Sequence, residues 1–353
     1  MGKVFERNGC RIKLSEPELY VDNQGRNRSG HMSHAMAELA NGTLIDFNSN
    51  CSPVRLNGHA AYGWIEYRTS SDKGRTFSDV KLLPYAQQAF HDGIFTVSVE
   101  KAAALTSGRV VAFCLRNDML HPVCCEPWFT PMAIHSDDGG ESWSDPVEVS
   151  PYRGRIYDVL CRNDIIYILH FCNDAEVTFT GNKPEHLYRL YVSEDGGESF
   201  TERSVLPMDT QGRGYGSILF DTDGRLHMYA YNINRERYMD HLVSSDLGLT
   251  WEVCEPCYLE KGIRNPQTAL IDGVYILHGR GENGHGFVLY SSVDGYTWDK
   301  GEYLEHDKGF CYYSNNIVLR EADGSNVLLI QYSDTYASWC VNVMHMRLKI
   351  EKI

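Results

Sequence analysis

Short apolar runs separated by polar turns extend along the whole chain. Glycines and Asn-Gly or Asp-Gly pairs end these runs after about five to eight residues, a typical strand length. Trp64-Ile65-Glu66-Tyr67 and the run at 188–192 show the pattern. No long stretch has the apolar period of an amphipathic helix. The pattern therefore predicts an all-β protein.

A turn motif recurs five times between these runs. Its pattern is Ser-x-Asp-x-Gly-x-Ser/Thr-aromatic, and residues 136–143 read Ser-Asp-Asp-Gly-Gly-Glu-Ser-Trp. Residues 70–77, 193–200 and 244–251 share the pattern, whereas 291–298 lacks the aspartate at its usual place. The five starts, at 70, 136, 193, 244 and 291, lie 66, 57, 51 and 47 residues apart. Recurrence at this spacing indicates a repeat architecture.

Each copy of the motif is predicted to form the turn of a β-hairpin, because an apolar run leads into the serine and a shorter run follows the aromatic residue. The aspartate can accept hydrogen bonds from amides inside the turn, and the glycine can adopt a positive φ. We expect Asp138 and Asp246 to bond their own turns, and Trp143 and Trp251 to be buried.

The turns divide the chain into six units that follow one template of four strands. The sixth unit has no copy of the motif, and segment 4–14 is expected to complete it and close the ring, leaving no free sheet edge. We therefore predict one domain, residues 1–353. The units are expected to start near His31, His91, Arg155, Gly214, Arg264 and Tyr312.

The recurring motif resembles the Asp-box (BNR repeat) of the sialidase, or neuraminidase, superfamily. The resemblance covers nearly the whole chain. It implies an all-β fold, a six-bladed β-propeller of the sialidase type. Because Asp-boxes are structural turns that also occur in propellers with other functions, the activity has to be argued from the site itself.

Composition narrows the classes of partner. The formal net charge of −14 disfavours nucleic acid, although a local cationic pocket could still bind an anionic sugar. No apolar run approaches the roughly 20 residues that span a bilayer, and the N-terminus lacks the apolar core of a signal peptide. We expect a cytoplasmic protein with no membrane partner, reduced thiols at its 11 cysteines, and no cofactor or metal.

The template places chemistry-bearing residues at one end of the blades, where first strands begin and second strands lead into third strands. Long polar loops lie there, and such loops carry binding groups on a rigid scaffold. Histidine suits proton transfer near neutral pH, and arginine binds carboxylates through two hydrogen bonds. The substrate-binding candidates are His31, His34, His91, Arg155, Arg213, Arg264 and Arg280. The catalytic candidates are Tyr313, His59, Asp92, Glu126 and Tyr215.

The resemblance assigns roles to some of these residues. Sialidases bind the sugar carboxylate with three arginines, and they use an aspartate as acid/base and a tyrosine nucleophile that a glutamate activates. Tyr313, which precedes an apolar strand, looks like the nucleophile. The aspartate's place falls near His59 and the glutamate's place at Tyr215, while the first arginine's place lies between His31 and His34. We therefore predict a diverged site, with His59 and Tyr313 about 5–9 Å apart.

Three functions are compatible with this set of residues. The first is a sialidase-like glycoside hydrolase that cleaves the glycosidic bond of an acidic sugar in an oligosaccharide or glycoside. The second is a uronate-acting lyase, in which arginine offsets the carboxylate while histidine or tyrosine moves protons. The third is a non-catalytic glycan-binding propeller. Asp92 and Glu126 are the carboxylate candidates for acid/base work, and either could instead pair with an arginine.

Overall fold

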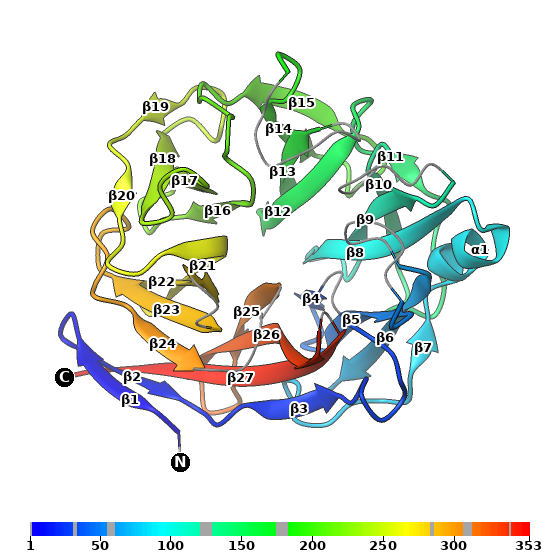
Figure 1. Cartoon of the computed structure of the whole chain (residues 1–353), viewed down its shortest axis with the longest axis horizontal. Coiled ribbons are helices and arrows are strands. Elements are labelled where there is room, and N and C mark those ends of the chain that lie inside the picture. Colours follow the sequence, from blue (N-terminus) through cyan, green and yellow to red (C-terminus); the bar gives the residue numbers. More distant parts are fainter. Residues whose placement is uncertain are drawn as a thin grey trace. The chain divides into compact units, whose positions relative to one another are not determined.

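Six antiparallel β-sheets form the six-bladed β-propeller that the repeats predict (Figure 1). The chain has two compact units: the blade 1–3 unit, Asn27–Gly212, and the blade 4–6 unit, Met1–Arg26 with Arg213–Ile353. The organisation as a single domain stays a prediction. The computed structural model describes residues 2–30, 34–54, 61–120, 129–173, 183–282, 286–305, 313–338 and 340–353.

In the blade 1–3 unit, consecutive strands are hydrogen-bonded neighbours within each four-stranded sheet. Blade 1 contains β4 (His34–Glu38), β5 (Leu44–Cys51), β6 (Gly63–Ser70) and β7 (Lys81–Leu82). Blade 2 contains β8 (Phe95–Ala104), β9 (Val110–Asp118), β10 (Met132–Ser136) and β11 (Val147–Glu148). Blade 3 contains β12 (Gly154–Arg162), β13 (Ile165–Cys172), β14 (Tyr188–Ser193) and β15 (Thr201–Val205).

The blade 4–6 unit repeats this plan with additions. Blade 4 contains β16 (Gly216–Phe220), β17 (Leu226–Tyr231), β18 (Tyr238–Ser244), β19 (Glu252–Val253) and β20 (Cys257–Tyr258). Blade 5 contains β21 (Ile263–Ile271), β22 (Val274–Gly281), β23 (Phe287–Ser292) and β24 (Glu302–Glu305). Blade 6 contains β25 (Ser314–Arg320), β26 (Asn326–Ala337) and β27 (Cys340–Lys352), with β1 (Val4–Arg7), β2 (Cys10–Leu14) and β3 (Glu18–Val21).

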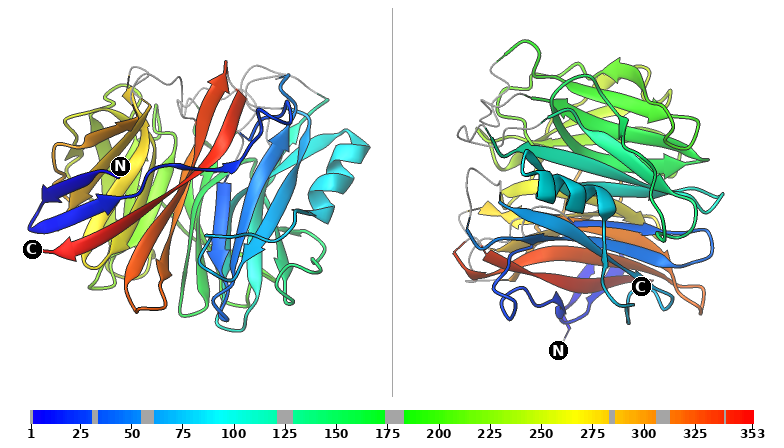
Figure 2. Two further views of the ribbon diagram at one scale, coloured as in Figure 1. Left: turned by 90° about the horizontal axis from the view of Figure 1, so that it is seen from below. Right: turned by 90° about the vertical axis from the view of Figure 1, so that its right-hand side faces the viewer.

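The N-terminal segment runs beside the C-terminal strand (Figure 2). β2 is antiparallel to β27, with Ile12 opposite Ile350, and β1 pairs with β2 at the outer edge. Ile12 is buried in one cluster with Leu328 and Leu348, so burial of apolar surface supports this pairing. Blade 6 therefore takes its outer strands from the opposite end of the chain.

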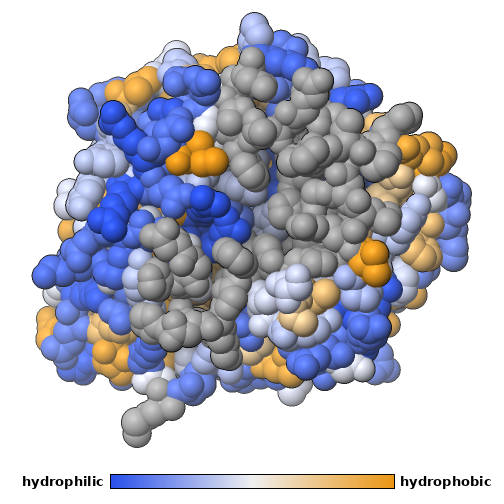
Figure 3. Space-filling view, viewed as in Figure 1, coloured by the Kyte–Doolittle hydropathy of each residue, from blue (hydrophilic) through white to orange (hydrophobic). Residues whose placement is uncertain are grey.

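The two ends of each blade differ in what they carry. The first strand begins and the second strand leads into the third at one end, whereas the first hairpin turn and, in blades 1 to 5, the Asp-box lie at the other. Within each unit the first strands are neighbours, since β8 contacts β4 and β12, and β21 contacts β16 and β25. Hydrophilic side chains dominate the left part of the face in Figure 3, over blades 4 and 5.

The apolar pattern does not reveal helix α1 (Pro84–Asp92). Proline in its first turn costs no helical hydrogen bond, and Gly93 ends the helix with a φ of 70°. Only Ala86 and Ala89 are buried, against the neighbouring strands β6 and β8. Two small buried residues give a weak periodic signal, which explains why the sequence does not predict the helix. No helix among the described residues is long and apolar enough to cross a membrane.

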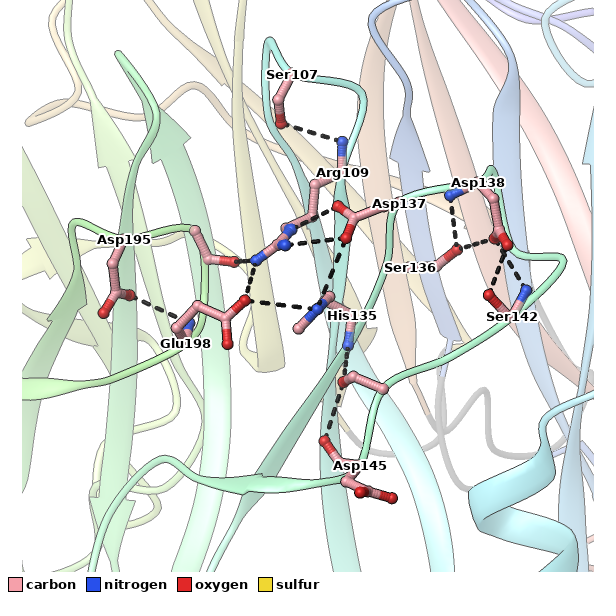
Figure 4. Close-up of polar contacts among 12 residues, drawn as sticks. Ser107, Arg109, His135, Ser136, Asp137, Asp138, Ser142, Asp145, Asp195 and Glu198 are labelled. Carbon is pink, nitrogen blue, oxygen red and sulfur yellow. Dashed lines mark hydrogen bonds and ion pairs between the residues drawn. The ribbon is translucent and has the colours of Figure 1, made fainter.

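The Asp-box of blade 2 shows how the motif closes its turn (Figure 4). Asp138 accepts hydrogen bonds from Ser136 Oγ (2.8 Å), Ser142 N (2.9 Å) and Ser142 Oγ (2.6 Å). Gly140 has a φ of 92°, and its N–H donates to Ser136 Oγ at 2.8 Å. Asp246 makes the equivalent contacts in blade 4. Both aspartates bond their own turns, as predicted.

The fifth copy of the motif keeps its aspartate, so the sequence alignment of this copy is wrong by one residue. Ser292, not Ser291, is the motif serine, and its Oγ donates to Asp294 at 3.0 Å. Asp294 also accepts hydrogen bonds from the N–H groups of Tyr296 and Thr297, both at 2.8 Å. The segment between aspartate and threonine is one residue shorter here, which hides the aspartate from the pattern.

The box aromatic residues of blades 2 and 5 pack against the preceding blade. Trp143 lies against Tyr67 of blade 1, with ring centroids 5.8 Å apart, and Trp298 lies against Tyr229 of blade 4 at 5.9 Å. Trp143 and Trp251 are half-buried, so the prediction that both are buried is wrong. The contact with Tyr67 covers part of the Trp143 ring and leaves the rest of it in solvent.

Donors on one blade also bind the box of the next blade. Between blades 2 and 3, Arg109 donates to the carbonyl of Gly196 at 3.2 Å and forms ion pairs with Asp137 and Glu198, each at 2.7 Å (Figure 4). At two other junctions a tyrosine hydroxyl donates to a backbone carbonyl of the next blade's box. Tyr67 of blade 1 donates to Gly140 at 2.6 Å, and Tyr229 of blade 4 donates to Gly295 at 2.9 Å. The boxes therefore connect blades as well as closing turns.

No disulfide joins the cysteines within the described ranges. Cys254 and Cys257 form a Cys-x-x-Cys pair at the edge of blade 4. Burial raises the pKa of both thiols, that of Cys257 to about 12. Both are therefore protonated at neutral pH, and a protonated thiol is a poor nucleophile and metal ligand.

Candidate active site

Three tyrosines gather where the first strands of the blade 4–6 unit begin. Tyr215 immediately precedes β16, Tyr231 ends β17, and Tyr313 immediately precedes β25. The ring centroid of Tyr215 lies 6.3 Å from that of Tyr231 and 6.2 Å from that of Tyr313. Two of the predicted catalytic residues, Tyr215 and Tyr313, are therefore adjacent. We call these three residues the tyrosine group.

Tyr215, in the middle of the group, has an unusual backbone conformation. Its φ is 56°, a region that glycine favours and bulky residues rarely adopt. Its carbonyl accepts a hydrogen bond from Tyr231 N at 3.4 Å, and only 7% of the residue is exposed. Such strain persists where the surroundings impose it, and it clusters at functional sites.

Two arginines of blade 5 lie beside the tyrosine group. Arg264, the second residue of β21, is directly opposite Arg280 of β22, so both side chains leave the sheet on the same face. The Arg264 guanidinium is 5.7 Å from the ring centroid of Tyr231. Both arginines act electrostatically on the Tyr231 hydroxyl.

A single glutamate accepts hydrogen bonds from both an arginine and a tyrosine. Glu236 accepts hydrogen bonds from Arg264 Nε at 2.6 Å, from Arg264 Nη2, and from Tyr231 Oη at 2.9 Å. Arg280 has no carboxylate partner among the described residues. Two arginines and one glutamate leave one uncompensated positive charge here, although the protein carries a net charge of −14.

The ionisation of Tyr231 is set mainly by its burial. Burial raises the pKa of this hydroxyl well above its ordinary value of 10.0, and Glu236 raises it further, whereas Arg264 and Arg280 act in the opposite direction. Tyr231 therefore stays protonated at neutral pH and donates its proton to the hydrogen bond with Glu236. It acts as a positioning residue for that carboxylate rather than as a phenolate.

Arg213 lies at a cavity of blade 4. Its Nε donates to Asp240 Oδ2 at 2.5 Å, and both residues line a cavity of about 360 Å³. Tyr313 does not line this cavity. Of the four arginine candidates, Arg264 and Arg280 are therefore the two whose described contacts lead to the tyrosine group.

In the blade 1–3 unit the candidates are buried or lie on the helix. Arg155 Nε donates to Glu100 Oε2 at 2.7 Å, and each side chain is only 6% exposed. His34 is the first residue of β4 and is buried. The charge of Arg155 is thus compensated inside the protein.

His91 and Asp92 lie in the last turn of α1, on the periphery of blade 2 (Figure 1). Both are exposed, and Asp92 accepts a hydrogen bond from Gln88 Nε2 at 2.8 Å. The first strand of blade 2 begins at Phe95, so the prediction that it starts near His91 is wrong by four residues. Helix α1, which the sequence does not predict, takes up the chain before this strand.

Three candidates, His31, His59 and Glu126, lie outside the described residues, so the distance between His59 and Tyr313 stays a prediction. The sequence analysis missed Tyr231 and Glu236. The charged run Arg-Glu-Arg at 235–237, in the loop after β17, is the signal that points to Glu236. The role of Tyr231 depends on its hydrogen bond to Glu236 in the following loop and on Arg264 of blade 5, which no pattern of apolar and polar residues shows.

The two curated relatives found by sequence comparison are both sialidases. No protein-family model matches the chain. A sialidase of Paraclostridium sordellii is 24% identical over 259 residues, which cover 64% of this chain and 57% of that protein. A sialidase of Clostridium perfringens is 24% identical over 293 residues, which cover 75% of this chain and 70% of that protein. The chain thus matches little more than half the length of the first of these relatives.

Solved structures share the fold. A protein of unknown function from Dyadobacter fermentans superimposes with a TM-score of 0.71 at 14% identity, covering 96% of this chain and 99% of that one. The Hadza microbial sialidase Hz136 has a TM-score of 0.68 at 15% identity, covering 96% and 68%. Trypanosoma rangeli sialidase with the inhibitor DANA has a TM-score of 0.64 at 13% identity, covering 91% and 55%. The resemblance predicted from the Asp-boxes is confirmed: this chain is similar to the sialidases in sequence and shares their six-bladed β-propeller.

Proposed function

We propose that this protein is a sialidase-like glycoside hydrolase with a diverged site, which binds an acidic sugar at Arg264 and Arg280 and cleaves the adjacent glycosidic bond. The observation that supports this best is Arg280, which projects beside Arg264 and has no carboxylate partner among the described residues. A guanidinium in this state can bind a sugar carboxylate through two parallel hydrogen bonds.

Tyr313 is the proposed nucleophile. Its oxygen would bond to the anomeric carbon as the glycosidic bond breaks, with the phenol proton passing towards Glu236 and the leaving oxygen taking a proton from the acid at the place of His59. Water would then hydrolyse the glycosyl-tyrosine bond, giving its proton to that acid, and Tyr313 would regain its own proton. A neutral hydroxyl avoids the repulsion that a carboxylate nucleophile would meet from an anionic sugar. Tyr313 is half-buried, whereas Tyr231 is buried and its hydroxyl is bound to Glu236. Tyr313 is therefore the better placed of the two to reach a substrate.

Tyr215 stands where the resemblance puts the glutamate that activates the nucleophile. A protonated phenol cannot accept the proton of a second phenol, as a carboxylate can. Glu236 is the carboxylate whose described contacts reach the tyrosine group, through Tyr231. We therefore expect slower turnover than a directly paired tyrosine and glutamate would give.

The test compares the wild type with Tyr313→Phe and Tyr231→Phe on aryl glycosides of sialic acid and of glucuronic acid. Tyr313→Phe is expected to lower kcat by at least about 10²-fold, the size of a lost proton-transfer or covalent group. Tyr231→Phe keeps the ring and removes only the hydrogen bond to Glu236, so a smaller loss is expected. Wild-type turnover by Tyr313→Phe would contradict its role as the nucleophile.

The replacement of a carboxylate by Tyr215 also favours a second candidate function, glycan binding without catalysis. Product analysis separates the alternatives. A hydrolase releases a new reducing end, a lyase makes an unsaturated sugar that absorbs near the ultraviolet edge, and a binding protein makes neither product. Binding of acidic sugars through Arg280 without any product would support the second candidate.

A further inference from the structure

A polar cavity opens on blade 4 beside the loop at 232–237. Its volume of about 360 Å³ falls in the range of small-molecule sites in proteins. This loop borders both the cavity and Arg264, because Arg235 lines the cavity whereas the next residue, Glu236, binds Arg264. The lining residues are Arg213, Asn232, Asn234, Arg235, Tyr238, Asp240 and Pro256.

Hydrogen bonds hold one wall of the cavity in place. Asp240 Oδ2 accepts from Arg213 Nε at 2.5 Å and from Asn232 Nδ2 at 3.5 Å. Asn232 is 4% exposed, and its Oδ1 accepts from the backbone N–H groups of Asn234 (3.0 Å) and Arg235 (3.2 Å). Asn232 thus fixes the turn that carries two of the lining side chains.

Other groups around the cavity are available to a ligand. The Asn234 amide and the Arg235 guanidinium have no side-chain partner in the part of the chain that the structure describes. The Tyr238 residue is 39% exposed, and its ring meets that of Tyr258 edge-on, with centroids 5.4 Å apart. These two tyrosines are opposite each other on β18 and β20, so the pairing of the strands supports the exposed ring.

We propose that this cavity is a second sugar-binding site, which takes a neutral pyranose residue. Hydroxyl groups both donate and accept hydrogen bonds, as the mixture of arginine, amide and carboxylate requires. The apolar faces of a pyranose can pack on the exposed ring of Tyr238. Asp240 and Arg213 are paired in the wall of the cavity, so the groups that face a ligand are the Asn234 amide, the Arg235 guanidinium and the Tyr238 ring. These groups suit the hydroxyl groups and the apolar face of a sugar.

The choice of sugars as the ligand class rests on the proposed function, but the residues of the two sites differ. The arginine and tyrosine site takes the acidic residue, and the blade 4 cavity takes a neutral one. Because both sites border the loop at 232–237, an oligosaccharide with both kinds of residue can contact the loop from both sides. The cavity would then help to select the glycan that carries the acidic sugar.

The test is a titration of the full chain with lactose, a neutral disaccharide, followed by calorimetry and saturation-transfer NMR. The wild type is expected to bind lactose, and Tyr238→Ala and Arg235→Ala are each expected to weaken binding by at least about 10-fold. Tyr238→Phe keeps the ring and should retain most of the affinity. Tyr152→Ala removes an exposed tyrosine of the other unit and is the matched control, with unchanged binding.

Failure of this inference can be told apart from failure of the proposed function. No lactose binding by the wild type, or equal binding by folded Tyr238→Ala and Arg235→Ala, would overturn the second site even if acidic glycosides are cleaved. Lactose binding that depends on Tyr238, in a protein that cleaves no glycoside, would support the second site and contradict the hydrolase. Because Arg235 is exposed, Arg235→Ala provides a reading even if Tyr238→Ala does not fold.

Discussion

Arg155 and Arg264 occupy the same position of the repeat in different surroundings. Each is the second residue of the first strand of its blade, and each is paired with a glutamate. The residue opposite Arg155 in the sheet is Phe171, whereas the residue opposite Arg264 is Arg280. An apolar neighbour in blade 3 is thus replaced by a second positive charge in blade 5.

Access to water differs as well. The side chains of Arg155 and its partner are 6% exposed, whereas those of Arg264 and Glu236 are 37% and 21% exposed. A buried pair is balanced and closed to ligands, while an accessible pair beside an uncompensated arginine can bind an anion. The position of an arginine in the repeat does not decide its function; its cross-strand neighbour and its exposure do.

The largest effect on stability is expected from Arg155→Ala. This change removes the guanidinium that is paired with the buried Glu100 carboxylate, which should lower the free energy of unfolding by about 3–5 kcal/mol. Arg264→Ala should cost about 1 kcal/mol or less, because water can replace the partner of an accessible glutamate. Urea denaturation of both variants measures the difference. Similar small losses in the two variants would contradict the contrast between a structural and a functional arginine.

An acid-dependent loss of stability is expected in both units. Burial lowers the pKa of His170 in blade 3 and of His241 in blade 4 from 6.5 to about 3. The unfolded chain therefore binds more protons than the folded protein between these values, and stability should fall as the pH decreases from about 6.5 towards 3. Denaturation midpoints across this range measure the effect. His241→Gln, which cannot titrate, should flatten the profile, and an unchanged profile would contradict the assignment.

A small effect is expected from a change in an Asp-box. Asp195 in blade 3 accepts hydrogen bonds from Ser193 Oγ (2.8 Å) and from Ser199 N (3.0 Å) and Oγ (2.5 Å). Asp195→Ala should lower the free energy of unfolding by about 1 kcal/mol, because water can reach the freed groups of this exposed turn. Turnover per folded molecule should not change. A large loss of turnover in well-folded protein would show that the box does more than close a turn.

Most of the fold could be predicted because its turns repeat a chemistry that the sequence displays. The serine, aspartate and glycine of the box form hydrogen bonds and backbone conformations within the turn itself, so these residues recur wherever the turn recurs. The aspartate of the fifth box was not recognised because the turn is one residue shorter there. Asp294 therefore does not align with the aspartates of the other copies, although it keeps its hydrogen bonds. The helix at 84–92 was not predicted because its buried residues are two small alanines, which give a weak apolar pattern.

Less of the candidate site could be predicted, because it depends on contacts between blades. Tyr313 and Tyr215 could be identified since both directly precede first strands, and the repeat aligns these starts. Tyr231 ends a second strand, and its link to Arg264 through Glu236 requires the register of two sheets and the path of one loop. Neither appears in a local pattern of apolar and polar residues.

The most direct test of acidic-sugar recognition is the affinity of Arg280→Ala for glucuronic acid, with glucose as the neutral control. The wild type should prefer the acid, and Arg280→Ala should weaken its binding by about 10- to 100-fold, the size of a lost charge-assisted hydrogen-bond pair. Arg280→Lys should keep part of the affinity, since it retains the charge but not the bidentate geometry. Binding of glucuronic acid by folded Arg280→Ala at wild-type strength would contradict the assignment of this arginine as the carboxylate-binding group.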